Sequence, residues 1–318
     1  MKILVTGANG FVGAHLVEHL AVVGHDVVEA VRRPGTAALR GREVVVGTVG
    51  RSTDWSQALT GCDAVVHLAA RVHVMNDTSP DPAEDFRETN ARGTRRLAQA
   101  CVRAGVPRLV FLSSVKVNGE ATAGRPFSVD DAPAPVDPYG VSKAEAEQLL
   151  RAETHGTATT PVVVRTPLVY GPGVGGNVAT CLRLVSRGVP LPLALVRNSR
   201  RMMSVTGLAR LLERAATDPA AAGALVMAAD EAPVSTPDLL RHLAAGMGRR
   251  SLLLPVPVAA LRLGARALGA TAVVDRLTGS LDVRPGSTAS SFDWRSGSDP
   301  ETDLRATGRW FADQGTRR

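Results

Sequence analysis

The chain has 318 residues, of which 44% are hydrophobic and 21% are charged, and this balance is typical of a folded globular protein. Its formal net charge is +7, but the arginines are spread along the chain and form no basic block interleaved with aromatic residues. Nucleic-acid binding is therefore disfavoured, and anionic small molecules account better for the charge. The three cysteines, Cys62, Cys101 and Cys181, lack metal-ligand spacing, so we expect reduced thiols, a cytoplasmic location and no metal site.

Short apolar runs alternate with longer segments of helical periodicity over the first 170 residues. The N-terminal run MKILVTGANG is too short for the core of a signal peptide, so we expect it to begin with a strand. The expected strands are Lys2–Thr6, Asp26–Val31, Glu43–Gly47, Ala64–Leu68, Arg108–Ser113 and Val162–Arg165. The expected helices between them are Phe11–Val23, Ala83–Ala104 and Pro138–Ala152. This alternation predicts an α/β fold with a doubly wound parallel sheet.

Proline and glycine become frequent after about Gly171, and the later helices at Val205–Ala216 and Thr236–Met247 alternate with irregular segments. We therefore expect a dinucleotide-binding domain over residues 1–170 with a return near 205–230. A smaller C-terminal substrate-binding lobe would take residues 171–204 and 231–318. The apolar region from Leu252 is broken by two prolines and two arginines, which disfavours a membrane span but leaves open an amphipathic helix at a membrane surface.

The first expected strand runs directly into TGANGFVG, which places Gly7, Gly10 and Gly13 at a strand-to-helix turn. Glycines there permit a tight turn and let the backbone approach a pyrophosphate at the helix N-terminus. A purely structural turn is the alternative, but the position between strand and helix favours a Rossmann dinucleotide site. The expected cofactor-binding residues of this motif are Gly7, Asn9, Gly10, Phe11, Val12 and Gly13.

The second expected strand ends at Val31, followed by Arg32 and Arg33, with no carboxylate where an NAD-binding site would have one for the ribose hydroxyls. Guanidinium groups match a 2′-phosphate in geometry and charge. We therefore expect NADP(H), with NAD(H) still possible. The alternative is that the two arginines are simply solvated loop residues.

The stretch YGVSK places Tyr139 and Lys143 one turn apart on the same face of a helix that begins at Pro138. A tyrosine that donates a proton at neutral pH benefits from a nearby ammonium that stabilises its phenolate. Alone, this spacing more often marks a surface pair.

Together, the glycine-rich turn, HLAA at His67–Ala70, Ser114 and the Tyr139/Lys143 pair resemble the extended short-chain dehydrogenase/reductase family, particularly its nucleotide-sugar epimerases, dehydratases and ketoreductases. The resemblance implies that Ser114, Tyr139 and Lys143 are catalytic. It also implies that Leu68, Ala69 and Ala70 line the cofactor, with Tyr139 and Lys143 touching it as well. Ser113 is then expected to serve packing at the end of its strand. Asn118 stands where the family has an aromatic residue.

Family dehydratases carry an Asp-Glu pair just after the catalytic Ser or Thr, because eliminating water needs an acid and a base. This chain has Val115 and Lys116 there, so dehydration is disfavoured. The remaining reactions are reduction of a 4-keto sugar and 4-epimerisation.

The family pattern also implies contacts to the substrate, with Ser114 meeting the sugar. Asn177 and Arg200 match diphosphate contacts, although the later aspartate of that motif is Gly207 here, and Arg201 could serve by a one-residue offset. Arg276 is expected as a second phosphate contact. Leu168 replaces a frequent asparagine, and His73 could face the sugar, although a lone histidine is more often a packing residue.

The nearest resemblance is to bacterial 4-ketoreductases that form UDP-N-acetylquinovosamine. We therefore expect NADPH-dependent reduction at C4 of a UDP-4-keto-6-deoxy sugar. The alternatives are a UDP-glucose 4-epimerase with tightly bound NAD and a non-catalytic NADP-sensing regulator. Family resemblance further implies a homodimer packed through Ala83–Ala104 and Pro138–Ala152. The identity of the sugar and of the nucleotide stays open.

Overall fold

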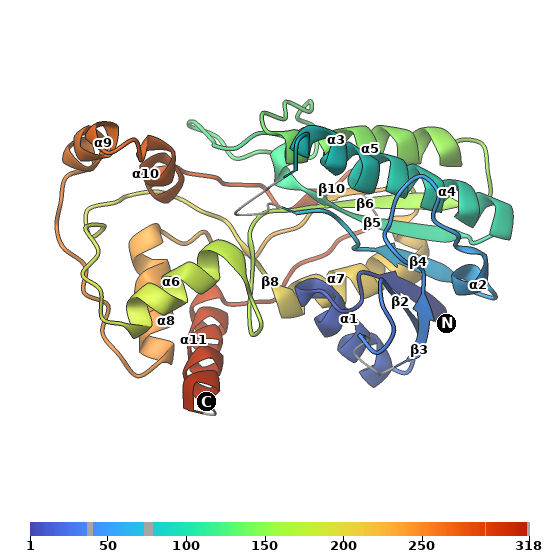
Figure 1. The fold of residues 1–318 in the computed structure, drawn as a ribbon, viewed down its shortest axis with the longest axis horizontal. Helices are drawn as coiled ribbons and strands as arrows, with labels where there is room; N and C mark the ends of the chain where they lie inside the picture. The colour runs from blue at the N-terminus through green and yellow to red at the C-terminus, as the bar shows by residue number, and fades with distance from the viewer. Residues whose placement is uncertain (37–40, 73–78, 290, 317–318) are drawn as a thin grey trace.

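A central eight-stranded sheet organises the molecule, shown by a computed structural model that describes residues 1–36, 41–72, 79–289 and 291–316 (Figure 1). The strand order is β10-β9-β6-β5-β4-β1-β2-β3, and only the β9–β10 pair is antiparallel. Its strands are β1 Lys2–Thr6, β2 Asp26–Val31, β3 Arg42–Val45, β4 Ala64–His67, β5 Arg108–Ser114, β6 Thr160–Thr166, β9 Leu225–Met227 and β10 Gly286–Ser287. The expected doubly wound α/β fold is confirmed.

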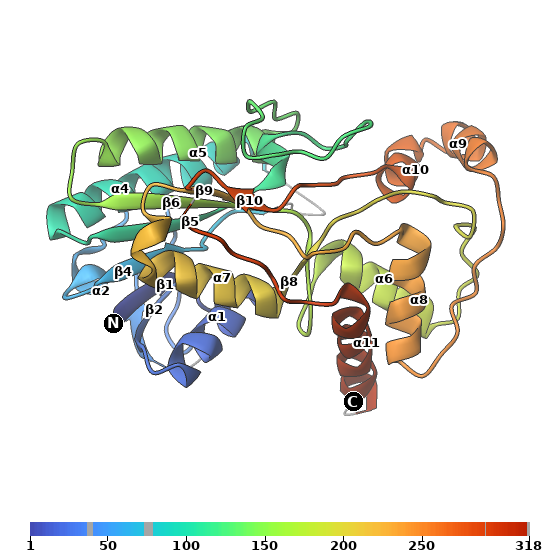
Figure 2. The ribbon, with the colours of Figure 1, turned by 180° about the vertical axis from the view of Figure 1, so that it is seen from behind.

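Helices cover both faces of this sheet, which explains why its strands are continuous apolar runs. On one face lie α1 (Phe11–Val22) and α7 (Val205–Thr217), which pack on side chains such as Ile3 and Val5 (Figure 2). On the other face lie α2 (Ser56–Leu59), α4 (Gly93–Ala104) and α5 (Pro138–Thr154), which pack around Leu4. Alternate residues of β1 therefore serve two separate cores.

The expected helix Ala83–Ala104 is interrupted. It consists of α3 (Pro82–Phe86), one π-helical segment over Arg87–Arg92 and α4. Asp81 caps α3 by accepting a hydrogen bond from the Glu84 N–H at 3.0 Å. A 3.6-residue periodicity does not reveal a π turn, so the sequence predicted one regular helix instead.

A second group of helices forms the smaller lobe beside the carboxyl edge of the sheet (Figure 1). It contains α6 Gly176–Ser186, α8 Thr236–Gly246, α9 Val258–Ala267, α10 Thr271–Thr278 and α11 Pro300–Thr316. A two-stranded sheet of β7 (Val169–Tyr170) and β8 (Met203–Ser204) lies where the chain crosses between the lobes.

Residues 286–289 and 291–294, which were expected in the smaller lobe, return to the sheet. β10 pairs with β9, while Phe292 and the half-buried Trp294 pack in the core beneath α7. The two-residue strand GS carries no apolar pattern, so no sequence signal marked it. We still propose a division into two lobes, with these residues assigned to the dinucleotide-binding domain.

The smaller lobe depends on a very close approach of α8 and α11. A Cβ on Gly246 would lie 2.1 Å from the Arg305 carbonyl oxygen, and one on Gly308 would lie 2.3 Å from the Leu243 carbonyl oxygen. Glycine at both positions lets the two backbones touch, so the packing tolerates no side chain at either contact.

We predict that Gly246→Ala lowers the free energy of unfolding by about 1–3 kcal/mol, because the new methyl group forces the two helices apart. Gly264→Ala is the matched control: a Cβ at this helical glycine meets nothing within 4 Å, so alanine should stabilise the chain by about 0.5–1 kcal/mol. Urea denaturation of both variants measures the difference. Equal stabilities would contradict the close packing of α8 on α11.

Candidate active site

The turn between β1 and α1 is built so that only glycine fits its key positions. Gly7 has a φ of +67°, and a Cβ on it would lie 2.9 Å from the Ala69 nitrogen. A Cβ on Gly13 would lie 2.1 Å from the Gly7 carbonyl oxygen. Gly10 caps α1, and it is exposed together with Asn9, so the start of the helix is open to a ligand.

The loop after β4 lies directly against this turn. The Leu68 and Ala69 N–H groups both donate to the Thr6 hydroxyl at 3.1 Å, which holds the loop at the end of β1. The structure thereby brings together the two groups of expected cofactor residues, those of the glycine turn and Leu68, Ala69 and Ala70. Phe11 and Val12 are half-buried, and the Phe11 ring packs edge-on against His15 at 5.7 Å.

Ser114 and Tyr139 meet at the carboxyl end of β5. Asp137 caps α5 by accepting the Gly140 N–H at 2.6 Å, and Pro138 begins the helix, so Tyr139 sits in its first turn. The Ser114 hydroxyl accepts the Lys116 N–H at 3.2 Å and is hydrogen-bonded to the Tyr139 phenol. The structure thus brings together two residues that the family resemblance implied to be catalytic.

Lys143 lies beneath this pair with only 3% of its surface exposed. Its Nζ donates to the Leu112 carbonyl oxygen at 3.0 Å, and it stands 4.6 Å from the centre of the Phe111 ring and 6.0 Å from that of the Tyr139 ring. A carbonyl and the face of an aromatic ring thus stabilise the ammonium where a carboxylate would usually do so.

Burial controls the electrostatics of the site. It lowers the pKa of Lys143 to about 7, although Glu147 acts in the opposite direction. Burial also raises the pKa of Tyr139 to about 12, against the hydrogen bond from Ser114, and Asp137 raises it further. This direction is opposite to the lowered tyrosine pKa expected from the Tyr-x-x-x-Lys spacing, because loss of hydration outweighs the hydrogen bond from Ser114.

A buried ion pair supports the site from behind. Glu147, one turn after Lys143, receives two hydrogen bonds from Arg165 at 2.6 and 2.9 Å and one from the Ser113 hydroxyl at 2.5 Å. Arg165 also donates to the Asn118 side-chain oxygen at 3.1 Å. Ser113, expected only to pack, therefore joins β5 to α5. Because every member is buried, loss of either charge would leave the other without a partner.

Asn90 is a site-building residue that the sequence analysis missed. It lies in the π-helical segment, is 1% exposed, and accepts the Arg71 N–H at 2.8 Å while donating to the Arg71 carbonyl at 3.0 Å. Its amide also donates to the Ser142 hydroxyl at 2.9 Å. One side chain therefore joins the loop after β4 to the helix that carries Tyr139. A lone asparagine within a helical pattern gives no sequence signal for such a role.

Among the described residues, no acidic side chain at the end of β2 is available to a ligand. Glu29 is fully buried and accepts the Gly41 N–H at 2.9 Å, so its carboxylate points into the protein. Arg32 and Arg33 follow the strand and are both exposed.

The expected diphosphate contacts lie in the smaller lobe. Arg200 donates to the Arg276 carbonyl at 2.7 Å and to the Gly279 carbonyl at 3.1 Å, so two of these residues are adjacent, and the Arg276 side chain is exposed. Asn177 is exposed in the first turn of α6. Burial lowers the pKa of Arg200, and the nearby Cys181 acts in the opposite direction. Asn177 precedes Cys181 by four residues, so the two side chains share one face of α6.

The remaining substrate residues differ in their environment. Arg201 forms an ion pair with Asp282 at 2.7 Å and donates to the Glu231 carbonyl, so its guanidinium is engaged within the lobe. Leu168 is 36% exposed. His73 lies outside the described residues.

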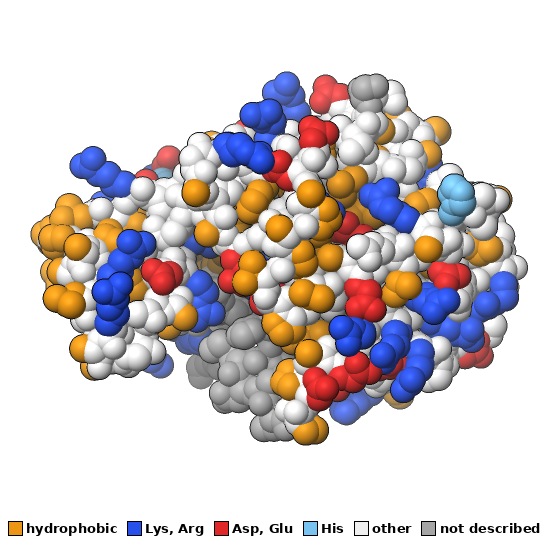
Figure 3. All heavy atoms as spheres, turned by 90° about the horizontal axis from the view of Figure 1, so that it is seen from above, with side chains coloured by type: hydrophobic (Ala, Val, Ile, Leu, Met, Phe, Trp, Pro, Cys, Tyr) orange, Lys and Arg blue, Asp and Glu red, His pale blue; other side chains and the backbone are white. Residues whose placement is uncertain are grey.

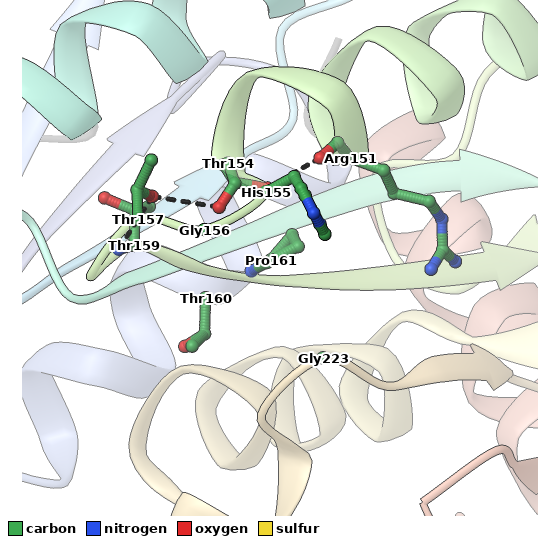
Figure 4. Close-up of a pocket in the computed structure, with 9 residues that line it drawn as sticks. All are labelled: Arg151, Thr154, His155, Gly156, Thr157, Thr159, Thr160, Pro161 and Gly223. Atoms are coloured by element: carbon green, nitrogen blue, oxygen red, sulfur yellow. Dashed lines mark hydrogen bonds between the residues drawn. The ribbon is translucent and has the colours of Figure 1, made fainter.

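A hollow of about 430 Å³ lies far from this site, where β6 begins (Figure 4). Its lining includes Arg151, His155 and several threonines. The hydroxyls of Thr154, Thr157, Thr159 and Thr160 all donate to backbone carbonyls. We assign it no ligand, because its hydroxyl donors are already used and it adjoins the amino end of the strand rather than the carboxyl end.

The part of the chain that the structure describes contains no cluster of three or more His, Cys, Asp or Glu side chains that could hold a metal ion. No helix within the same residues is long and apolar enough to cross a bilayer.

Comparison with known proteins gives consistent results. The model of the NAD dependent epimerase/dehydratase family matches residues 3–226. A UDP-glucose 4-epimerase of Vibrio cholerae is 39% identical over 296 residues, covering 92% of this chain and 90% of that protein. An N-acetyl-alpha-D-glucosaminyl-diphospho-ditrans,octacis-undecaprenol 4-epimerase of Escherichia coli O157:H7 is 27% identical over 82% of this chain and 77% of its own. The structure of MoeE5 with UDP-glucuronic acid and NAD superposes with a TM-score of 0.78 at 28% identity, covering 99% of this chain and all of that one.

The low pKa of Lys143 predicts that its effect on the stability of the chain depends on pH. The pKa of Lys143 in the folded chain, about 7, lies below the usual 10.5. The buried charge therefore lowers the free energy of unfolding by its full amount below pH 7. This loss of stability shrinks as the pH rises from 7 and disappears near pH 10.5. Lys143→Met should therefore stabilise the chain at pH 6, with a smaller gain at pH 9. Thermal unfolding at both values measures it.

Lys116→Met is the matched control. Asp137 and Glu120 form ion pairs with Lys116 and raise its pKa, although burial opposes them, so its favourable contribution persists through both pH values. This variant should be less stable than the wild type at pH 6 and at pH 9. A Lys143→Met variant that loses stability at pH 6 would show that the buried ammonium is well compensated.

Proposed function

The chain belongs to the NAD dependent epimerase/dehydratase family, and on that premise we propose that it exchanges a hydride and a proton at one carbon of a nucleotide-linked sugar. The observation that carries this proposal is the contact between Ser114 and Tyr139 above the buried Lys143, at the same sheet edge as the glycine turn. A non-catalytic NADP sensor would need none of these three residues.

The residues at the sheet edge fit a nicotinamide dinucleotide. The Gly7–Gly13 turn leaves no room for side chains at its closest contacts, and the exposed start of α1 offers N–H groups to a pyrophosphate. When bound, the dinucleotide supplies or accepts the hydride. Tyr139 and Lys143 would complete its site beside Leu68, Ala69 and Ala70.

The chain's own residues would then handle the proton. With a pKa of about 12, Tyr139 is protonated at neutral pH and can donate to a ketone oxygen. Ser114 would hydrogen-bond the same oxygen and stabilise the developing alkoxide. Lys143, which titrates near pH 7, would stabilise the phenolate left behind whenever it carries its charge.

Reduction of a UDP-4-keto-6-deoxy sugar at C4 by NADPH is the more specific reaction that we propose. A protonated Tyr139 suits the reductive direction. The exposed Arg32 and Arg33, together with the inward-facing Glu29, favour a cofactor with a 2′-phosphate. Asn177, Arg200 and Arg276 would contact the diphosphate. Dehydration is disfavoured because Val115 and Lys116 follow Ser114, and the Lys116 ammonium is already paired with two carboxylates.

UDP-glucose 4-epimerisation with NAD is a second candidate. It is favoured by the identity of 39% to the Vibrio cholerae UDP-glucose 4-epimerase across most of both chains. MoeE5, with 28% identity, was solved with a UDP-sugar and NAD. Such an enzyme returns its hydride to the sugar and consumes no cofactor.

Two further properties are proposed for the assembled protein. A homodimer would pack through residues 83–104 and 138–152, which contain α4 and most of α5, two neighbouring helices on one face of the sheet. A cytoplasmic location would suit the three cysteines, which are all free thiols.

One assay separates the two reactions. The protein is incubated with a UDP-4-keto-6-deoxy sugar and NADPH, and separately with UDP-glucose without added cofactor, and the products are identified by NMR. A reductase consumes NADPH at 340 nm in proportion to the alcohol formed, whereas an epimerase forms UDP-galactose with no change in absorbance. Turnover in neither mixture would remove both candidates.

Tyr139→Phe is the matched control for this assay. It should lower kcat by about 10²–10⁴-fold with little change in sugar binding, because only the proton donor is lost. A variant with full kcat would contradict the role of the phenol in whichever reaction is observed.

The cofactor assignment is tested by Arg33→Asp, made singly and together with Arg32→Asp. The ratio of kcat/KM for NADPH to that for NADH should fall by at least about tenfold, because the carboxylate repels a 2′-phosphate and accepts ribose hydroxyls. Arg187→Asp, at another exposed arginine, controls for the change in net charge. An unchanged ratio would assign both arginines to the solvated loop.

A further inference from the structure

The helices α9 and α10 form a hairpin at the end of the molecule remote from the sheet (Figures 1 and 2). One side of the hairpin packs against the smaller lobe. Val258, Leu261 and Leu277 pack against the core that α6 and α8 share, and Ala265 is the one buried residue of α9. The opposite side of the hairpin faces away from the protein.

That outer side is apolar. Ala259, Leu263 and Ala267 are exposed and follow one another at four-residue spacing, so they form a stripe along α9. Leu263 is 71% exposed, and Leu268, in the turn to α10, is 83% exposed. Hydrophobic side chains gather at this end of the molecule in the space-filling view (Figure 3). The helix α9 thus carries apolar side chains on the face that packs on the lobe and on the opposite, exposed face. The exposed face is not covered by the described residues.

The same region is strongly basic. Residues 249–276 contain five arginines and one aspartate, so they carry more than half of the formal net charge of +7. Arg262 and Arg266, one turn apart, line a hollow of about 370 Å³ together with Thr271 and Asp275 of α10. Arg262 lies 3.5 Å from Asp275, so part of its charge is compensated within the hairpin.

We propose that the α9–α10 hairpin binds the surface of an anionic phospholipid bilayer. Leu263 and Leu268 would enter the boundary between head groups and acyl chains, while Arg262 and Arg266 meet lipid phosphates. An apolar stripe bordered by arginines is the pattern of a helix that lies in the plane of a membrane. This binding does not depend on which sugar reaction the protein performs.

The charge also decides against a second copy of the chain as the occupant. In a two-fold symmetric contact through this stripe, Arg262 and Arg266 of each copy would approach the same arginines of the other. Like charges brought together across an interface oppose association, whereas an anionic lipid surface attracts them.

Sedimentation with sucrose-loaded vesicles tests the proposal without any sugar or cofactor. The protein should bind vesicles that contain phosphatidylglycerol, bind vesicles of phosphatidylcholine alone far more weakly, and be released by salt. The double substitution Leu263→Gln and Leu268→Gln should weaken binding by at least about tenfold, since both apolar anchors are lost. Circular dichroism checks that these exposed changes leave the fold intact.

Val22→Gln is the matched control, because Val22 is 76% exposed at the end of α1, outside the hairpin. It should bind vesicles like the wild type. Failure of the wild type to bind anionic vesicles, or equal binding by the double variant, would overturn the proposal. So would a dimer that becomes a monomer on the double substitution without vesicle binding, which would assign the stripe to self-association. Soluble glycerol phosphate that binds as tightly as vesicles would point to a free anion and would also overturn it.

Discussion

The buried ammonium group of Lys143 constrains how the candidate active site is assembled at the carboxyl edge of the sheet. Among the described residues, no carboxylate forms an ion pair with Lys143, and its charge is held by the Leu112 carbonyl and the face of Phe111, both contributed by β5. Lys143 reaches these partners because α5 packs against β5. The same placement brings Tyr139, one turn earlier, onto the hydroxyl of Ser114. The ion pair of Glu147 and Arg165 then fixes the next turn of the helix to β5 and β6.

Much of this arrangement could be predicted from the sequence because it depends on local patterns. The strand runs, the Gly7–Gly13 turn and the start of α5 are each encoded within a few residues, and parallel strands must present their carboxyl ends at one edge. The pairing of Ser114 with Tyr139 came from family resemblance, since they lie far apart in the chain.

Other features could not be predicted because they depend on distant partners. β10 has two residues and is recognisable only by its pairing with β9. The direction of the Tyr139 pKa follows from burial, which spacing does not report. Asn90 acts through contacts with Arg71 and Ser142, on two other segments, and no motif marks them. The orientation of Glu29 toward Gly41 is likewise visible only in the fold.

The π-helical segment over Arg87–Arg92 adds a residue to the helix and so changes which way the later residues face. A π turn holds about one residue more than an α turn, so everything after it is rotated by roughly 100° relative to an uninterrupted helix. The extra residue lets Asn90 reach the loop after β4 while Leu97 and Cys101 still face the core. The residues before and after the π turn therefore face different partners. Inserting or deleting one residue in this helix would break either the contact of Asn90 with the loop or the packing of Leu97 and Cys101 in the core.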